Sequence, residues 1–219
     1  MVKARVPETD QGIQGDFEPR IYDQMQRRFR DKGWMETKAV ISSGIDRGLA
    51  LEVGPGPGYL GLEWLKHTQG TELRGLDISP DMIAIAEANA AEYGLSNRAR
   101  YVQGNGQNLP FEDATFDAVF TNGSLHEWSE PEKTFAEVHR VLKPGARYFI
   151  SDLRRDISPL MRWLMYSMTR PKAIRPGLIT SLDASYTQKE AEEMLKRSPL
   201  KSAKVSKNVM GIVVIGERE

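Results

Sequence analysis

The stretch Leu51-Glu52-Val53-Gly54-Pro55-Gly56-Pro57-Gly58-Tyr59-Leu60 joins a short apolar run, a glycine-rich turn and the start of a helical pattern. Glycines in such a turn let the backbone approach a ligand closely, and the first N–H groups of the helix remain free to donate. Asp77 lies 21 residues after Gly56, at the end of the next apolar run, where a carboxylate can hold both hydroxyls of a ribose. Together these features predict a nucleoside site at the carboxyl edge of a parallel sheet.

Short apolar runs and helical patterns alternate outward from this stretch, which is typical of an α/β fold with helices on both faces of a doubly wound sheet. The predicted strands are Gly48–Val53, Glu72–Asp77, Arg100–Gly104, Phe116–Thr121 and Ala146–Asp152, and the predicted helices are Tyr59–His67, Ser79–Tyr93 and Pro131–Leu142. Residues Ala203–Met210 and Gly211–Ile215 predict two closing strands joined by a tight turn, which requires an antiparallel strand. The sequence therefore predicts a seven-stranded, Rossmann-like sheet with an antiparallel C-terminal strand.

Local signals mark several helix ends. Ser79 can cap a helix that has Pro80 at its first position, and Lys143-Pro144-Gly145 is expected to separate a helix from the following strand. Thr187 and Glu190 have the spacing of a capping box.

The N-terminal part divides into a tail and two helices. Residues 1–17 are polar and predict a flexible tail or a cover that orders late. A helix from Pro19 would place Tyr22, Met25 and Phe29 on one stripe, and a second helix is expected over Met35–Ile45. We expect residues 18–219 to form a single domain.

Composition excludes several classes of protein. The chain has 219 residues, 30 Lys and Arg against 30 Asp and Glu, and no cysteine. The balanced charge argues against binding nucleic acid by bulk positive charge, and the missing cysteine excludes disulfides, cysteine-ligated zinc and thiolate chemistry. No apolar run is long enough to span a membrane, and the first 17 residues are too polar for a signal peptide, so we expect a cytoplasmic protein.

Several motifs resemble those of class I S-adenosylmethionine (SAM)-dependent methyltransferases, in the methyltransferase type 11 group. Glu52-x-Gly54-x-Gly56-x-Gly58 is similar to their motif I, and Gly75-Leu76-Asp77-Ile78-Ser79-Pro80-Asp81-Met82 is similar to their ribose motif. Val102–Phe111 resembles the segment that borders adenine, Phe116–Val119 the fourth strand and Val141–Gly145 the turn before the fifth. The resemblance covers about Gly48–Asp152, with the motifs in family order.

The resemblance implies SAM as cofactor, S-adenosylhomocysteine as product and a set of contacts to the cofactor. Asp77 would hold the ribose, Ile78 would pack on adenine, and Thr121 and Asn122 would lie beside the sulfonium. The full set of implied cofactor-binding residues is Glu52, Gly54, Gly56, Gly58, Asp77, Ile78, Met82, Asn105, Gly106, Thr121 and Asn122. Asn105 stands where the family usually has aspartate, and its amide oxygen can still accept a hydrogen bond from the adenine amino group.

Two other functions stay open. Gly56-Pro57-Gly58-Tyr59-Leu60-Gly61 also fits the dinucleotide pattern, so a nicotinamide-dependent oxidoreductase is allowed. A SAM-binding regulatory protein without catalysis is the second alternative.

Methyl transfer depends mainly on aligning the nucleophile, the methyl group and the sulfur atom, and it needs a base only where an acceptor proton must leave. His126 follows the fourth strand and is the candidate base, because the pKa of histidine is ordinarily near neutral. A histidine that packs on the sheet is the alternative. The sequence predicts no metal site, since its three histidines are scattered.

The segment Arg154–Arg175 carries six basic residues against one acid and a methionine stripe. Within an insertion over residues 154–182, it predicts a lid over an apolar or aromatic acceptor that can carry negative charge; Tyr22, Met161, Met165 and Tyr166 are the candidate substrate contacts. The alternative is a helix whose methionines pack on the domain and whose arginines are solvated, and peripheral membrane contact or RNA binding are further options.

Short segments near both ends are similar to ubiquinone/menaquinone biosynthesis C-methyltransferases, namely Tyr22-Asp23-Gln24-Met25 and Asn208–Val213. Thr121-Asn122-Gly123-Ser124 differs from the motif of nucleic-acid amino methyltransferases. We therefore expect a small-molecule substrate, no nucleic acid partner, and a monomer or homodimer.

Overall fold

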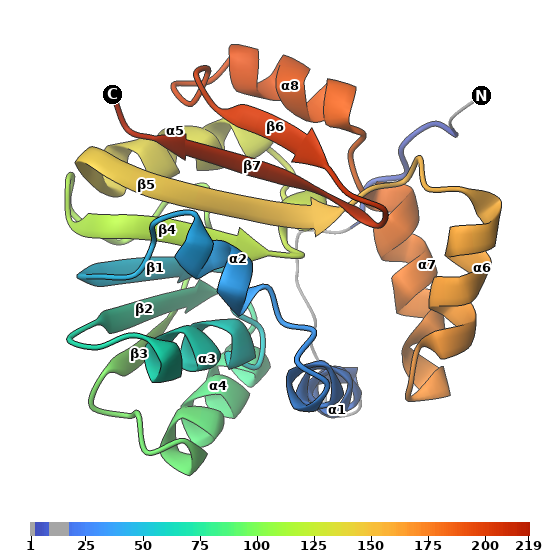
Figure 1. Ribbon diagram of the computed structural model, residues 1–219, viewed down its shortest axis with the longest axis horizontal. Coiled ribbons are helices and arrows are strands. Elements are labelled where there is room, and N and C mark those ends of the chain that lie inside the picture. Colours follow the sequence, from blue (N-terminus) through green and yellow to red (C-terminus); the bar gives the residue numbers. More distant parts are fainter. Residues whose placement is uncertain (1–2, 9–17) are drawn as a thin grey trace.

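One seven-stranded sheet runs through the molecule, with strand order β3-β2-β1-β4-β5-β7-β6 (Figure 1). The computed structural model describes residues 3–8 and 18–219, and of Glu18 only the backbone. The strands are β1 (Leu49–Val53), β2 (Glu72–Asp77), β3 (Ala99–Gln103), β4 (Phe116–Asn122), β5 (Leu142–Leu153), β6 (Lys204–Lys207) and β7 (Gly211–Glu217). The strands β1 to β5 are parallel to one another, and β7 is antiparallel to both β5 and β6, which confirms the predicted fold class.

Helices lie on both faces of the sheet and beyond its carboxyl edge (Figure 1). They are α1 (Glu18–Asp31), α2 (Thr37–Ser42), α3 (Tyr59–His67), α4 (Pro80–Glu92), η1 (Leu125–Glu127), α5 (Pro131–Val141), α6 (Pro159–Met168), η2 (Lys172–Ile174), α7 (Arg175–Ala184) and α8 (Gln188–Lys196). The caps follow the sequence: the Ser79 hydroxyl accepts from the N–H of Met82, and Thr187 and Glu190 form both bonds of the capping box.

The start of β5 differs from the prediction. Lys143-Pro144-Gly145 was expected to separate a helix from a strand, but β5 begins at Leu142 and includes these residues. Leu142 pairs with Phe116, and the register shifts before the next pair on β4. Gly145 has φ +74°, a conformation that glycine adopts without strain. The turn signal therefore marks a bulge in the strand.

The core has one half on each face of the sheet. On one face, Phe135 and Val138 of α5 and Met194 and Leu195 of α8 pack with inward-facing strand residues. On the other, residues of α2, α3 and α4 form one apolar cluster with strand residues. Trp64 of this cluster packs its ring against Phe120, and its indole N–H donates to the carbonyl of Ile45 at 2.7 Å. These apolar faces hold the strands in register, so the loops at the carboxyl ends have fixed positions.

The chain reverses direction across the sheet between β1 and β4, because β2 and β3 lie on one side of β1 and β4 and β5 on the other. Ligands of open α/β sheets bind at such a switch point, beyond the carboxyl ends of the strands. The turns after β1, β2 and β4 all open at this place, which is where the sequence predicts the nucleoside site.

The insertion after β5 lies beyond the carboxyl ends of the strands and carries α6, η2 and α7 (Figure 1). Its η2 contacts α1, so the insertion and the N-terminal helix meet outside this edge. No residue of α6 is buried, and Leu160 and Trp163 are 72% and 64% exposed. The predicted lid is therefore a helical insertion beyond the carboxyl edge.

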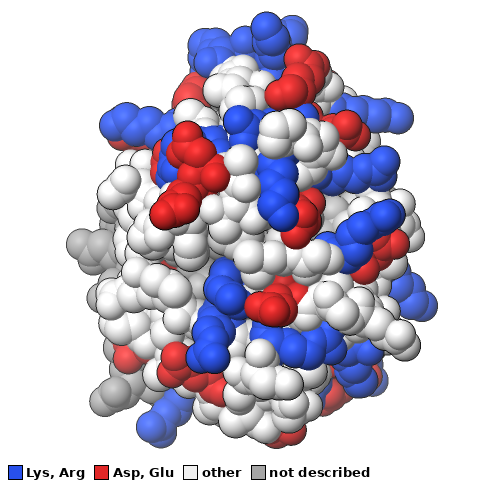
Figure 2. Space-filling view, turned by 90° about the vertical axis from the view of Figure 1, so that its left-hand side faces the viewer, with Lys and Arg blue, Asp and Glu red and all other residues white. Residues whose placement is uncertain are grey.

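Charges of both signs are interspersed on the face at the amino ends of the strands (Figure 2). Neither sign forms a continuous patch there, in agreement with the formal net charge of zero. Within residues 3–8 and 18–219, none of the helices combines the length and the apolar character that crossing a bilayer requires.

Candidate cofactor site and adjoining polar cluster

The glycine loop between β1 and α3 needs its glycines for conformation and for space. Gly54, Gly56 and Gly58 have φ values of +67°, +52° and +83°, which residues with a side chain rarely adopt. A Cβ on Gly54 would lie 2.7 Å from Cβ of Ser124, and one on Gly58 would lie 2.6 Å from the Tyr101 hydroxyl. The loop can therefore follow this path only with glycine at these positions.

Asp77, at the end of β2, holds the loop with its carboxylate. Its Oδ2 accepts from the N–H of Gly56 at 2.9 Å, and its Oδ1 accepts from the N–H of Ser79 at 2.9 Å. Burial raises the pKa of Asp77, and the N–H groups of Ser79, Gly56 and Ile78 oppose that rise. Asp77 thus joins the glycine loop to the start of α4, a structural role that sequence reasoning missed.

A cleft of about 740 Å³, open to solvent, lies at the switch point between the loop and β4. Seven of the predicted cofactor residues line it: Gly54, Gly56, Asp77, Ile78, Met82, Asn105 and Gly106. A smaller hollow of about 290 Å³ adjoins it and is lined by Glu52, Asn122 and eight further residues. Tyr22 and Gly54 line both spaces, which therefore adjoin one another at the loop.

The carboxyl group of Glu52 is buried beside the smaller hollow. The residue is 2% exposed, and its Oε2 has no hydrogen-bond partner among the described residues. Burial raises the pKa of Glu52 to about 8, while the N–H of Gly61 lowers it and the charge of Asp77 raises it further. The free Oε2 of this buried carboxyl can accept from a cationic group of a ligand in the hollow.

Two predicted cofactor residues line neither space. Gly58 is the N-cap of α3. The Thr121 hydroxyl is buried and lies 2.6 Å from the Ser124 hydroxyl, so it packs under the loop that follows β4. Asn105 lines the cleft, but its Oδ1 already accepts from the N–H of Gln107 at 2.9 Å.

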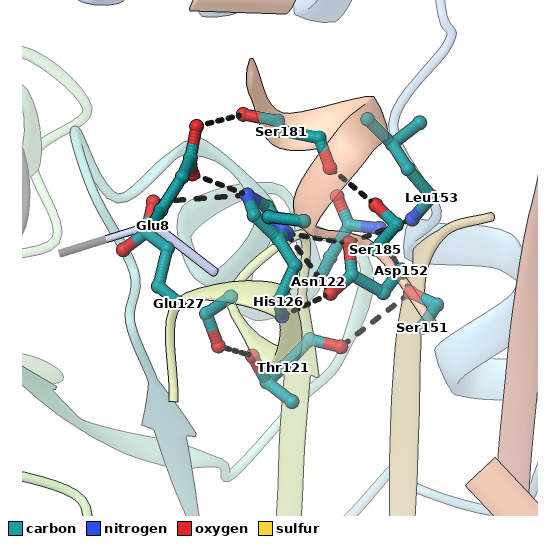
Figure 3. A network of polar contacts seen from close by, with 12 residues as sticks. Glu8, Thr121, Asn122, His126, Glu127, Ser151, Asp152, Leu153, Ser181 and Ser185 are labelled. Carbon is teal, nitrogen blue, oxygen red and sulfur yellow. Dashed lines mark hydrogen bonds and ion pairs between the residues drawn. The ribbon is translucent and has the colours of Figure 1, made fainter. Parts of the chain in front are cut away.

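His126, the predicted base, lies in a buried polar cluster beside the cleft and does not line it (Figure 3). Its ring Nδ1 lies 2.9 Å from Oδ1 of Asp152, and its backbone N–H donates to Oδ2 of Asp152 at 2.6 Å. Its Nε2 faces Oε2 of Glu8 at 3.4 Å and Oε1 of Glu127 at 3.9 Å. Of these neighbours, Glu127 also lines the cleft.

The carboxylates around His126 govern its proton affinity. Burial alone would lower the pKa of His126, but the charge and hydrogen bond of Asp152, with the charges of Glu127 and Glu8, raise it to about 9. Burial raises the pKa of Glu127 to about 7, against the influence of His126. The imidazole without any added ligand is thus charged at neutral pH and is not a ready base.

Sequence reasoning missed Asp152 and Glu8 as partners of His126. Asp152 could have been found, because β4 and β5 are parallel neighbours and their carboxyl ends meet. Glu8 belongs to the predicted tail 1–17, of which residues 3–8 lie against η1 and α7 and residues 9–17 lie outside the described part of the chain. No local pattern pairs Glu8 with a histidine 118 positions later.

Of the four predicted substrate contacts, Tyr22 lines the cleft. Met161 and Met165 are half-buried on α6, and the Tyr166 ring lies 4.9 Å from the guanidinium of Arg175. None of these three lines the cleft or the hollow.

The arginines of segment 154–175 are held by the protein itself. Ion pairs join Arg154 to Asp156, Arg155 to Glu190 and Arg162 to Asp183. The guanidinium groups of Arg170 and Arg175 donate to backbone carbonyls of Ser167 and Thr169. The predicted alternative of solvated arginines is therefore wrong for these five, which stabilise the insertion.

The comparisons with known proteins agree with this geometry. The family described as "Methyltransferase domain" matches residues 51–150. An uncharacterized methyltransferase, YcgJ of Bacillus subtilis, is 29% identical over 63% of this chain and 54% of its own length. A demethylmenaquinone methyltransferase of Thermus thermophilus is 35% identical over 46% of this chain and 44% of its own. The chain thus spans about half the length of these curated relatives.

A solved structure supports the fold. A SAM-dependent methyltransferase from Aquifex aeolicus superposes with a TM-score of 0.70 at 20% identity, covering 93% of this chain and all of that one. The motif order, the sheet topology and these matches agree: residues 51–150 match a methyltransferase domain, and the fold is that of class I SAM-dependent methyltransferases. Methyltransferases of this domain and fold use S-adenosylmethionine as cofactor.

Proposed function

We propose that this protein transfers a methyl group from SAM to a small apolar or aromatic acceptor. The observation that carries the proposal is the pair of adjoining spaces at the switch point, one lined by Asp77 and the other by the buried carboxyl of Glu52. A ribose-binding acid and a buried acid whose Oε2 accepts no hydrogen bond from the described residues lie on either side of one glycine loop. They suit a ligand with a nucleoside at one end and an ammonium group at the other.

The residues that would hold the cofactor divide between the two spaces. The larger cleft suits the adenosine, with Asp77 on the ribose, and Ile78, Met82, Asn105 and Gly106 around the adenine. The smaller hollow suits the methionine end, where Glu52 would accept from its ammonium group. SAM supplies a methyl group already activated by a sulfonium, so the protein contributes mainly by positioning the reactants and excluding water.

α1 can supply that exclusion because the protein holds it over the loop. Asp23 accepts from the Tyr59 hydroxyl at 2.9 Å and from the side-chain amide of Asn89 at 3.2 Å. A Cβ on Gly56 would lie 3.3 Å from the Tyr22 ring, so this ring rests directly on the loop. Tyr22 thus forms an aromatic wall between the cofactor spaces and solvent.

The acceptor is proposed as apolar or aromatic because Tyr22 lines both spaces, at the junction where the sulfonium would lie between the adenosine and the methionine end. Relatives named demethylmenaquinone methyltransferase and sterol 4-C-methyltransferase point to ring-bearing acceptors of that kind. We do not extend the proposal to an anionic acceptor, because five arginines of segment 154–175 are bonded within the protein.

Calorimetry with S-adenosylhomocysteine tests the cofactor assignment. Asp77→Ala is expected to weaken binding about 10- to 100-fold, the effect of losing one hydrogen bond to a charged group. The matched control is Asp46→Asn, which changes an exposed acid that forms an ion pair with its neighbour Arg47, and it should bind as the unmodified protein does. Unchanged affinity in a folded Asp77→Ala protein would refute the ribose role.

Methyl transfer is then measured from isotope-labelled SAM to a panel of ring-bearing apolar acceptors. Transfer to a panel member supports the enzyme. Tight S-adenosylhomocysteine binding without transfer to any member would favour the regulatory alternative, and binding of NAD(P) in place of S-adenosylhomocysteine would favour the oxidoreductase.

A further inference from the structure

The polar cluster around His126 has a feature that cofactor binding does not use. His126 is 4% exposed, and its Nε2 has no hydrogen-bond partner among the described residues. The carboxylates of Glu8 and Glu127 are the groups that face this atom, at 3.4 and 3.9 Å (Figure 3). This buried ring nitrogen is thus aimed between two carboxylates at ion-pair distance and makes a hydrogen bond to neither.

The spacing of these atoms suits a metal ion. One ligand atom from each of Glu8, His126 and Glu127 lies within 4.8 Å of the other two. Nitrogen and oxygen ligands lie about 2.0–2.2 Å from a transition-metal ion, which separates neighbouring ligand atoms by about 3–3.5 Å. The distances from Nε2 to the two carboxylates therefore need little adjustment.

The other ring nitrogen of His126 is held as in metal sites. A histidine that binds a metal through one nitrogen usually donates its other N–H to a carboxylate, which fixes the ring and its tautomer. Asp152 accepts at Nδ1 and also accepts from the backbone N–H of His126, so the ring cannot turn away. This arrangement directs Nε2 at Glu8 and Glu127, where a metal ion would take the place of the proton that this nitrogen carries in the ligand-free protein.

The N-terminal segment that carries Glu8 is fastened to the same place. Arg5 donates to the carbonyls of His126 and Ala184, and its guanidinium lies 4.2 Å from the Tyr186 ring. The Ser181 hydroxyl lies 3.5 Å from the Glu8 carboxylate and can orient it. Glu8 is therefore brought to the cluster by the contacts of Arg5 and by the contact of its own carboxylate with Ser181.

The geometry points to a divalent transition-metal site formed by Nε2 of His126 and the carboxylates of Glu8 and Glu127. One imidazole and two carboxylates suit an ion such as Zn²⁺ or Mn²⁺, since imidazole favours the first and carboxylates the second. Three protein ligands leave coordination positions open. Because Glu127 lines the cleft, an open position can take an oxygen atom of the acceptor, a role that rests on the proposed function.

Titration calorimetry of the full chain with ZnCl₂ and with MnCl₂, without cofactor, tests the site. We expect one ion per chain, bound with at least about tenfold lower affinity in Glu8→Gln and in Glu127→Gln. Glu130→Gln is the matched control, because Glu130 lies three residues beyond Glu127 on the surface and pairs with Lys133. Its affinity should equal that of the unmodified protein.

Hydrogen exchange gives a second readout that does not depend on activity. Metal binding should slow exchange of the amides in residues 3–8, and Glu8→Gln should lose that protection while remaining folded. Absence of binding by both ions, or equal affinity in Glu8→Gln, would overturn the proposal. S-adenosylhomocysteine binding is measured separately, so failure of the metal site and failure of the proposed function are distinguishable.

Discussion

Cofactor affinity should depend on pH through Glu52. Its carboxyl group has a pKa of about 8 because it is buried, and both Asp77 and the Tyr101 hydroxyl lie within its electrostatic reach. At neutral pH the group is therefore mostly protonated before the cofactor binds. An ammonium group in the hollow favours the charged carboxylate, so binding should expel the proton.

The magnitude follows from that pKa. One pH unit below it, ionising the carboxyl costs about 1.4 kcal/mol, and two units below it about twice as much. The dissociation constant of S-adenosylhomocysteine should therefore fall about tenfold between pH 6 and pH 7. In Glu52→Gln the side chain cannot ionise, so affinity should be lower at pH 7.5 and nearly constant with pH.

Calorimetry in two buffers of different ionisation enthalpy measures the proton directly. At pH 6.5 the unmodified protein should release about one proton for each S-adenosylhomocysteine bound, and Glu52→Gln should release about none. Equal proton release by the two proteins would refute the assignment of the ammonium group to Glu52.

Three further predictions concern stability. The folded-state pKa of Glu52 lies above its usual value of 4.5, so the stability that this group contributes to the cofactor-free protein is fully present below pH 4.5 and is lost as the pH rises through 8. Denaturant titrations should show a loss of free energy of unfolding on the order of a few kcal/mol over this range. The same titrations of Glu52→Gln should not show this loss. Gly54→Ala should cost about 1–3 kcal/mol more than Gly70→Ala in the same titrations, since both glycines have positive φ but only Gly54 lacks space for a Cβ. Thr187→Ala should lower the free energy of unfolding by about 1 kcal/mol through loss of a cap, and Thr180→Ala, which removes an exposed hydroxyl inside α7, by clearly less.

The fold could be predicted because its signals are local. The glycine loop, the capping box of Thr187 and the apolar runs each specify a conformation within a few residues, and β2 and α3 begin and end where expected. The bulge near Gly145 could not be predicted. It depends on how β5 pairs with β4, and the same three residues also suit an ordinary turn.

The candidate site was predictable in part for the same reason. Asp77 follows from its spacing to the glycine loop, but its hydrogen bond to the Gly56 N–H depends on how the loop folds back over β2. The contact between Glu8 and His126 joins two distant parts of the chain, and neither residue carries a local sign of the other. Such contacts follow from tertiary packing, which cannot be recognised from the local patterns of a single sequence.

The neutral composition conceals a separation of charge that bears on the ligand. The arginines of segment 154–175 are bonded to carbonyls and carboxylates of their own region, so little of their charge is directed at the cleft. The carboxyl groups of Asp77, Glu52 and Glu127 line the two adjoining spaces instead. SAM carries a sulfonium and an ammonium group, so an acidic site attracts this cofactor and repels an anionic acceptor. The arginines of the insertion thus stabilise the fold, and the carboxyl groups of Asp77, Glu52 and Glu127 make the site acidic.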